Sequence, residues 1–405
     1  MQTRFHPRFN DLPDRQEADV VLRNCVHCGF CNAACPTYQL LGDERDGPRG
    51  RIYLIKQLLE TGSASEKTRI HLDRCLTCGS CETSCPSGVK YTRLLDIGRG
   101  IIEQQAPRRF LDGLLRWSLR RIVPYPKRVM ALFKLARFCR PLLPTMLKAK
   151  VPPQQAAATW PATRHRRTIL LLPGCVQAAV TPNTNSAAAR VLDKLGVRLK
   201  VATRTTCCGA LSYHLAKQGE GLEYMRRNID AWWPEIEAGA EAIISSASGC
   251  ALMIKEYGVA LQHDPAYAEK ARNVSALARD ISEVIAQEDL SLLKLKPRQV
   301  TTAFHCPCTL QHGQQLPGVV EKILAKAGIA LVATADPHLC CGSAGTYSIL
   351  QPQLSQRLLE NKLEALTINQ PAQIVTANIG CQLHLQSKAK VPVKHWIELL
   401  DQSSQ

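Results

Sequence analysis

CVHCGFCNAACP, residues 25–36, is the stretch that decides how the N-terminal part of this chain folds. The same cysteine spacing recurs in CLTCGSCETSCP, residues 75–86. Each stretch carries three cysteines with two residues between neighbours, then a fourth cysteine after three more residues, then proline. Thiolates at this spacing are ligands of iron–sulfur clusters, because a tight loop that carries three of them can enclose three corners of a cube. The sequence therefore predicts two [4Fe–4S] clusters within residues 1–100.

The fourth cysteine of each run is expected to bind the cluster of the other run, since it cannot easily reach the cube that its own run encloses. Pro36 and Pro86 are predicted to end local helix after that cysteine. Two zinc sites or buried thiols are the alternatives, but zinc ligands usually come in pairs separated by a wide gap. The predicted ligands are Cys25, Cys28, Cys31 and Cys85 for one cluster, and Cys75, Cys78, Cys81 and Cys35 for the other.

The 405-residue chain has eighteen cysteines, and they are expected to be reduced metal ligands rather than disulfides. The first twenty residues are charged and contain Pro7 and Pro13, so they lack the apolar core of a secretion signal. No stretch approaches the roughly 20 apolar residues of a membrane span. These features predict a cytoplasmic protein of two or three domains.

Positive charge is concentrated in residues 101–167, where fifteen Lys and Arg residues face only two acids, Glu103 and Asp112. Apolar residues recur between the basic ones, so this segment is predicted to be a basic, amphipathic helical connector. Its apolar side is expected to pack on this protein or a partner, and the alternative is that it lies on an anionic membrane. Because the excess charge is confined to one segment, no nucleic-acid partner is expected.

Residues 168–296 and 297–405 are two halves of an internal repeat. In each half, one cysteine lies 32 positions before an adjacent cysteine pair that glycine follows. A further cysteine comes 42 positions after the pair in the first half and 40 positions after it in the second. These cysteines are Cys175, Cys207, Cys208 and Cys250 in the first half, and Cys308, Cys340, Cys341 and Cys381 in the second.

Short apolar runs alternate with helical patterns in both halves, which predicts mostly parallel sheets flanked by helices. The repeat cysteines follow such runs, so they are expected to meet beyond the C-terminal ends of the strands. The fold class is thus α/β, with a helical, ferredoxin-type N-terminal domain and two duplicated α/β domains. The runs expected to form buried strands are 168–172, 242–244, 300–304, 329–332 and 374–375.

The four cysteines of each half are candidate ligands for a further iron–sulfur cluster. Zinc, a redox-active pair and buried thiols are the alternatives, since adjacent cysteines seldom bind one cubane without strain. His27, His305 and His312 lie beside cysteines and are expected to tune a cluster by hydrogen bonding rather than to bind iron.

Motifs for hydride or phosphate chemistry are missing from the sequence, as is a Ser-His-Asp signature. The chain is therefore predicted to have no catalytic residue and no flavin or nicotinamide site. It is expected to conduct electrons for a reaction that takes place on another subunit.

The chain resembles the iron–sulfur subunits of glycolate oxidase, whose relatives serve in anaerobic glycerol-3-phosphate dehydrogenase, lactate utilisation and heterodisulfide reductase. The resemblance implies an electron-transfer subunit that works with two flavin-type subunits, which oxidise glycolate to glyoxylate. Electrons would pass towards a quinone or another acceptor at the inner face of the cytoplasmic membrane. Besides both cysteine runs and the two "CCG" pairs, the resemblance rests on PTYQLLGDE (36–44), DGPRGR (46–51), NIDAWWP (228–234) and HCPCTLQH (305–312).

One departure from the relatives concerns the repeat. In heterodisulfide reductases each half ends in Cys-x-x-Cys, and five cysteines hold an unusual cluster. Here Ala247 and Asn378 stand three positions before Cys250 and Cys381, so each half is one ligand short and disulfide reduction is not expected. Two other functions stay open at this stage. One is the equivalent subunit of a lactate, glycerol-3-phosphate or other 2-hydroxy-acid dehydrogenase, and the other is a zinc-stabilised scaffold that binds nucleic acid.

Overall fold

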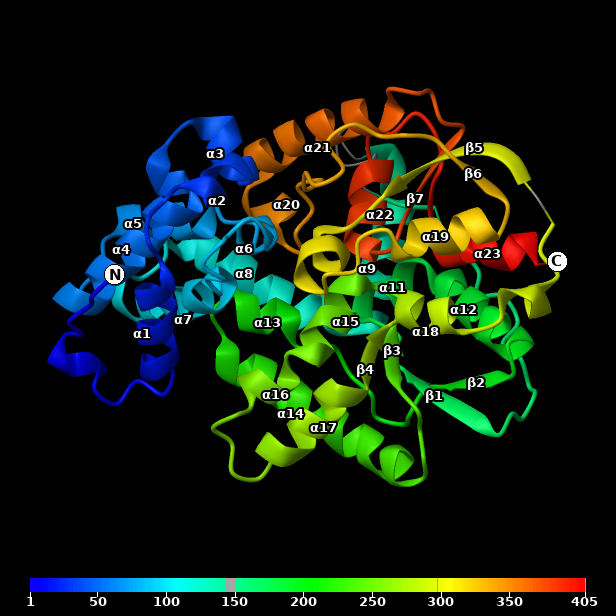
Figure 1. The fold of residues 1–405 in the computed structure, drawn as a ribbon, viewed down its shortest axis with the longest axis horizontal. Coiled ribbons are helices and arrows are strands. Elements are labelled where there is room, and N and C mark those ends of the chain that lie inside the picture. Colours follow the sequence, from blue (N-terminus) through cyan, green and yellow to red (C-terminus); the bar gives the residue numbers. More distant parts are fainter. Residues whose placement is uncertain (143–150, 154, 297, 405) are drawn as a thin grey trace.

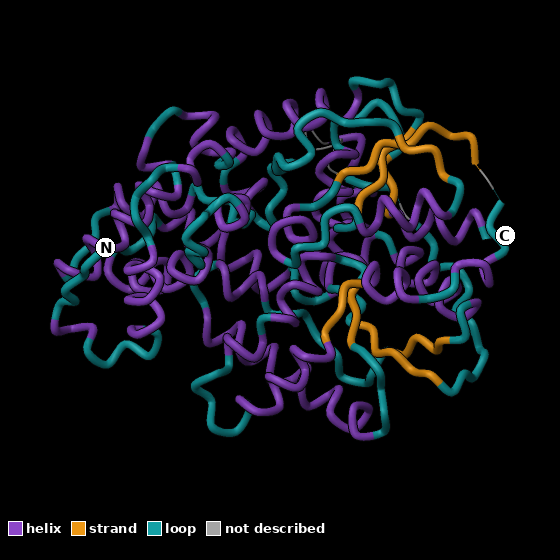
Figure 2. The backbone as a smooth tube through the Cα atoms, viewed as in Figure 1, coloured by secondary structure: helices purple, strands orange, loops and turns teal. Residues whose placement is uncertain are grey.

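The computed structural model describes residues 1–142, 151–153, 155–296 and 298–404 (Figure 1). A helical N-terminal region occupies one end of the molecule, and two α/β units occupy the other. Figure 2 shows that the described strands lie in two separate groups, both in the C-terminal part of the chain. The α/β fold class with a helical N-terminal domain is therefore confirmed.

The N-terminal region consists of short helices around a buried apolar core. Its central helix is α4 (Pro48–Thr61), which starts with proline in the first turn and ends at Gly62, whose φ of +74° suits a glycine cap. Ile52, Ile55 and Leu59 recur at helical spacing on its buried side. The other elements are η1 (Pro7–Phe9), α1 (Arg15–Asn24), α2 (Phe30–Ala33), α3 (Pro36–Leu41), η2 (Glu44–Asp46), α5 (Glu66–Asp73), α6 (Ser80–Thr83) and α7 (Tyr91–Gln105).

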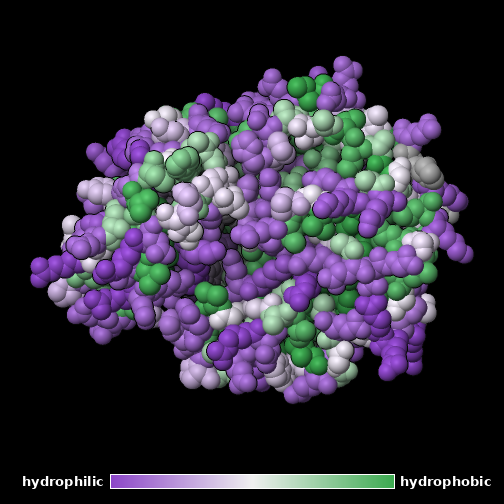
Figure 3. Space-filling view, in the orientation of Figure 1, coloured by the Kyte–Doolittle hydropathy of each residue, from purple (hydrophilic) through white to green (hydrophobic). Residues whose placement is uncertain are grey.

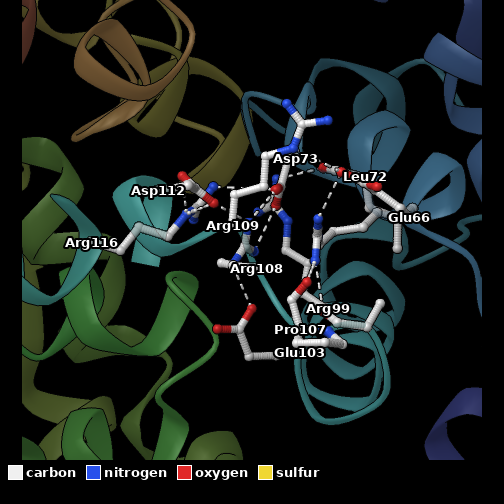
Figure 4. A network of polar contacts seen from close by, with 12 residues as sticks. Glu66, Leu72, Asp73, Arg99, Glu103, Pro107, Arg108, Arg109, Asp112 and Arg116 are labelled. Carbon is white, nitrogen blue, oxygen red and sulfur yellow. Dashed lines mark hydrogen bonds and ion pairs between the residues drawn. The ribbon is translucent and has the colours of Figure 1, made fainter. Parts of the chain in front are cut away.

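The basic segment forms two helices, α8 (Phe110–Ile122) and α9 (Pro126–Phe138), followed by η3 (Arg140–Leu142). We call α8 and α9 the connector helices. Figure 4 shows the polar network that fastens α8 to the N-terminal region, in which Arg108 and Arg116 converge on Asp73. Arg108 also donates to Glu103 at 2.7 Å. Some of the connector's basic side chains therefore form ion pairs with acidic residues of the same chain, and these pairs hold α8 in one orientation.

The first α/β unit has a four-stranded parallel sheet of order β2-β1-β3-β4. The central strands carry buried apolar residues, Ile169–Leu171 in β1 and Ile243 and Ile244 in β3, because helices cover both faces of the sheet. Its strands are β1 (Arg167–Leu171), β2 (Val197–Lys200), β3 (Ile243–Ser245) and β4 (Ala278–Asp280). Its helices are α11 (Cys175–Val180), α12 (Pro182–Lys194), α13 (Ala210–His214), α14 (Gln218–Glu237), α15 (Ser248–Lys255), α16 (Tyr257–Ala260), α17 (Ala268–Leu277), α18 (Ile281–Gln287) and η4 (Leu290–Leu293).

The second α/β unit repeats this plan with a parallel sheet of order β6-β5-β7-β8. Its strands are β5 (Arg298–His305), β6 (Ile329–Leu331), β7 (Gln373–Thr376) and β8 (Val393–His395). Its helices are η5 (Thr309–Gly313), α19 (Val319–Lys326), α20 (Tyr347–Leu350), α21 (Pro352–Thr367), α22 (Ile379–Gln386) and α23 (Trp396–Ser403).

The two α/β units share one hydrophobic core, in which side chains of β1, α12, α19 and α23 pack together. Polar contacts join the units as well. His395 Nε2 lies 2.7 Å from the carbonyl oxygen of Ser246, and Arg190 forms an ion pair with Asp401 at 2.6 Å. The duplicated units therefore pack together as one body and are not separate, independent domains.

Among the described residues, no helix is both long enough and apolar enough to cross a membrane. Hydrophilic side chains cover most of the face in Figure 3, and apolar ones form smaller groups between them.

Candidate metal centres

Cysteines of both N-terminal runs line a first cavity of about 420 Å³. Cys25 follows α1, and the backbone then takes positive φ values at His27 (57°) and Gly29 (88°) before α2 starts. These two left-handed residues turn the chain sharply, so that thiols three positions apart face one space. The cysteines around this cavity are Cys25, Cys28, Cys31, Cys81 and Cys85.

A second cavity of about 310 Å³ is built in the same way by the second run. Here Thr77 (φ 53°) and Gly79 (φ 74°) turn the chain between the cysteines. The cysteines around it are Cys35, Cys75, Cys78 and Cys81. Since Cys81 lines both cavities, the two are neighbours. Each cavity contains the fourth cysteine of the other run, as the crossed arrangement requires.

The donor chemistry of these cavities suits iron–sulfur clusters. Burial raises the pKa of the Cys31 thiol to about 11, and it raises the pKa values of Cys78 and Cys81 well above the usual range. At least four thiols line each cavity, and a cationic metal centre offsets the raised pKa values because it favours the thiolate form that binds it. The residues present therefore fit a cluster in each cavity.

Arg51 is a fully buried cation at the second cavity, and the sequence prediction missed it. Its Nε donates to the His71 carbonyl oxygen at 2.8 Å and its Nη2 donates to Thr37 Oγ1 at 3.1 Å. Burial by itself would lower the pKa of Arg51, but the acidic groups of Cys75 and its neighbours raise it. The guanidinium thus stays charged and can balance negative charge on cysteine ligands.

The four cysteines of the first repeat half gather beyond the C-terminal ends of β1, β2 and β3. Cys175 starts α11 directly after β1, and its Sγ lies 3.7 Å from Cys207 Sγ. The Cys208 thiol interacts with Cys250, which lies in α15. This half therefore brings together Cys175, Cys207, Cys208 and Cys250.

The second half gathers its four cysteines in the same place relative to its sheet. Cys308 interacts with Cys340, and Cys341 interacts with Cys381 in α22. His305, at the end of β5, joins them: its ring nitrogen and the Cys341 and Cys381 sulfur atoms all lie within 4.8 Å of one another. Asn378, three positions before Cys381, donates from Nδ2 to Cys381 Sγ at 3.5 Å.

The cysteines of the second half lie directly beside the second N-terminal cavity. Cys78 and Cys308 pack against the same small apolar cluster, which contains Cys340, so these thiols are close in space. Leu76 and Tyr347 pack around Cys340 in one small apolar cluster, against which Cys78 and Cys308 also pack. The first cavity, the second cavity and the four cysteines of the second half (the second quartet) therefore lie next to one another in that order.

One expectation needs revision. Pro36 does not end a helix: it occupies the first turn of α3, where proline's missing N–H and restricted φ are favourable. Cys306, the fifth cysteine of the second half, lies in the apolar core shared by the α/β units. His312 does tie two parts together, since its Nδ1 lies 2.9 Å from Thr83 Oγ1 of the N-terminal region.

Comparisons with protein families match both regions of the chain. Residues 21–89 match the 4Fe-4S dicluster domain, and residues 169–255 and 302–386 each match the cysteine-rich (CCG) domain. The N-terminal region is therefore a 4Fe–4S dicluster domain, and the repeat halves are two CCG domains.

Individual relatives extend the match over the full length. The chain is 53% identical to the glycolate oxidase iron-sulfur subunit of Escherichia coli (strain K12) over 404 residues, covering 100% of this chain and 99% of the relative. It is 29% identical to the probable glycolate oxidase iron-sulfur subunit of Bacillus subtilis (strain 168), covering 93% and 91%. Lactate utilization protein A of Bacillus velezensis is 24% identical and covers only 56% of this chain. The chain therefore belongs to the family of glycolate oxidase iron–sulfur subunits.

Proposed function

We propose that this chain carries single electrons from flavin-type subunits, which oxidise glycolate to glyoxylate, towards a quinone or another acceptor. The proposal is carried by the two adjoining cavities, each lined by three cysteines of one run and the fourth cysteine of the other. Bound [4Fe–4S] clusters supply the one-electron chemistry. Their ligands are Cys25, Cys28, Cys31 and Cys85 in the first cavity, and Cys75, Cys78, Cys81 and Cys35 in the second.

The exposure of the first cavity favours it as the side where electrons enter. Cys28 is exposed there, and the neighbouring apolar side chains of Val26 and Phe30 are 68% and 66% exposed. Exposed apolar side chains around a redox site fit a protein partner, because their burial stabilises a complex. Three of the four cysteines around the second cavity, Cys35, Cys75 and Cys81, are buried, and its fourth, Cys78, packs near Cys308 of the second CCG domain.

The function is tested by purifying this chain with its native partner subunits and measuring substrate-dependent dye reduction. We expect glycolate to support reduction and D-lactate or glycerol 3-phosphate to support it poorly. Phe30→Glu should slow glycolate-dependent reduction about tenfold, because a charge at the partner surface costs about 1.4 kcal/mol of binding or more.

The matched control is Ile368→Glu, which replaces another side chain that is 63% exposed, in the second CCG domain. It should leave the rate unchanged. Equal rates with lactate and glycolate would contradict the substrate, and purified protein that holds zinc without sulfide would contradict the electron-transfer role.

The connector helices support peripheral association with the inner face of the cytoplasmic membrane. Phe110, Leu111 and Phe138 are 80%, 76% and 85% exposed, and Leu114, Trp117, Leu132 and Leu135 of the same helices are exposed as well. Single exposed apolar side chains are ordinary, whereas a group of them marks an interaction surface. Exposed basic residues lie among these apolar side chains. This positive charge suits an anionic lipid surface better than a partner protein surface that has no acidic residues. The exposed basic residues are Arg109, Arg121, Lys127, Arg128, Lys134 and Arg140.

Membrane association predicts that the full chain co-sediments with vesicles of phosphatidylglycerol and phosphatidylcholine. The double variant Phe110→Ser/Leu111→Ser should bind about tenfold more weakly, because it removes two apolar side chains from the lipid interface. Leu292→Ser, at another exposed leucine, should bind like the unaltered chain. If the chain ignores these vesicles, and the double variant instead loses the flavin-type subunits, the connector helices are a protein interface.

A further inference from the structure

His305 is a buried histidine with one unsatisfied nitrogen. Its side chain is 1% exposed, and its Nδ1 lies 2.9 Å from Thr376 Oγ1 of the neighbouring strand β7. Within the described part of the chain, its Nε2 has no hydrogen-bond partner. A buried polar atom without a partner destabilises the folded state, so such an atom in a native protein calls for a ligand.

The surroundings of His305 supply the other donors of a metal site. A ring nitrogen of His305 lies within 4.8 Å of the sulfur atoms of Cys341 and Cys381. Thr376 holds the opposite side of the ring, which is how protein groups orient a metal-binding imidazole. Cys308 and Cys340 adjoin Cys341, so five donors face one small region.

The first CCG domain lacks this histidine. The position three residues before Cys175, which matches His305 before Cys308, is Leu172, and it is fully buried. An aliphatic side chain offers no electron pair to a metal. The two halves, although duplicated, therefore present different donor sets: four thiols in the first, and four thiols with one imidazole in the second.

A second difference is a buried cation. Gly209 and Gly342, which follow the cysteine pairs, have φ values of +91° and +84°, and an added Cβ would lie 2.7 Å from the carbonyl oxygens of Gly221 and Ser355. Because the same close contact occurs in both halves, α14 of the first half corresponds to α21 of the second, and their residues can be compared position by position. The residue seven positions beyond Gly221 is Asn228, and the residue seven positions beyond Ser355 is Lys362.

Lys362 places a positive charge beside the second quartet. It is 1% exposed, and its Nζ donates to the carbonyl oxygens of Asp336 at 2.9 Å and Pro337 at 3.2 Å. Among the described residues, its charge interacts with Cys306, Cys308, Cys340 and Cys341. Burying a cation is costly unless negative charge lies close to it, and thiolate ligands would supply that charge. Asn228 in the first half is neutral.

We propose that His305 is a ligand of a third iron–sulfur centre, held in the second CCG domain together with Cys308, Cys340, Cys341 and Cys381. The histidine takes the place of the cysteine that this half lacks. Five donors exceed the four of a structural zinc site, which favours a cluster with several iron atoms. The inference rests on the proposed electron-transfer function, since Cys308 of this site and Cys78 of the second N-terminal cavity pack against one apolar cluster, and a centre held here would supply one-electron chemistry next to that cavity.

The test uses the full chain, purified without oxygen, with iron and sulfide analysis and pulsed paramagnetic resonance. We expect about four iron atoms beyond the roughly eight of two cubanes, and a nitrogen coupling on one reduced centre. His305→Ala should lose the extra iron and keep both N-terminal signals. His305→Cys should retain iron but lose the nitrogen coupling, which a role in packing alone would not produce. Lys362→Met should lower the reduction potential of this centre, because the cation favours its more negative, reduced state.

Cys250→Ala in the first CCG domain is the matched control and should leave the nitrogen coupling unchanged. The inference fails if the unaltered chain shows no nitrogen coupling, if His305→Ala keeps all its iron, or if zinc occupies this site. In each of those cases two intact N-terminal clusters would leave the proposed function standing. Absence of all iron–sulfur signals would instead overturn the proposed function.

Discussion

Replacing Cys35 by alanine is expected to disrupt the cluster built on Cys75, Cys78 and Cys81 more than the cluster next to Cys35 in sequence. Cys35 lines the second cavity, where its sulfur is buried and lies 3.3 Å from Thr37 Oγ1. Removing it leaves that cluster with three protein ligands, and clusters of this type are held by four. Paramagnetic resonance of the reduced variant should show a lost or altered signal for one of the two clusters.

A control and a mirror experiment sharpen this prediction. Cys139→Ala replaces a cysteine at the end of α9, outside both cavities, and should leave both signals intact. Cys85→Ala should affect the other cluster, since Cys85 lines the first cavity. Loss of the Cys25 cluster alone in Cys35→Ala would contradict the crossed arrangement.

Arg51→Met is expected to have the largest effect on stability among substitutions outside the cysteines. Arg51 and Asp46 are both fully buried, with 3.5 Å between Nη2 and Oδ1. The substitution removes one partner of a buried ion pair and leaves Thr37 and His71 without their donor. Such losses typically cost about 3–5 kcal/mol. Anaerobic urea unfolding should show a lower midpoint, and the variant should also lose iron from the second cavity faster.

Arg74→Met is the matched control, because Arg74 binds the same carboxylate from a more exposed position. Its Nη1 lies 2.8 Å from Asp46 Oδ2, and its side chain is 33% exposed. Water can replace part of that interaction, so a loss of about 1 kcal/mol is expected. Equal losses for the two variants would show that burial of Arg51 adds nothing.

The central strands and the cysteine positions were predictable because both leave strong local patterns. The runs at 168–172 and 374–375 are apolar since helices cover both faces of these strands. The unpredicted strands β2, β4 and β8 lie at sheet edges, where one side is open and charges such as Arg198 and Arg279 are tolerated. Their short, mixed sequences carry no periodic signal.

The site was predictable only as far as the cysteines. Arg51 and Lys362 come from segments far from the cysteines they adjoin, and a buried charge cannot be told from a surface charge by sequence alone. The string HCPCTLQH did place His305 beside Cys308, but only the structure reveals that its Nε2 has no hydrogen-bond partner among the described residues. The connector's apolar side chains were expected to pack on this protein or a partner, and many of them are exposed on this chain.

The core that the two CCG domains share has a consequence for synthesis. α12 of the first domain packs against α23, which comes much later in the chain. Domains generally fold as units while the chain emerges, N-terminal parts first. Here the apolar surface of the first CCG domain is covered only after Trp396 and its neighbours have been synthesised. Nascent chains that stop short of α23 should therefore be bound by chaperones and cut by proteases, because α23 completes the core of a domain that begins more than 200 residues earlier.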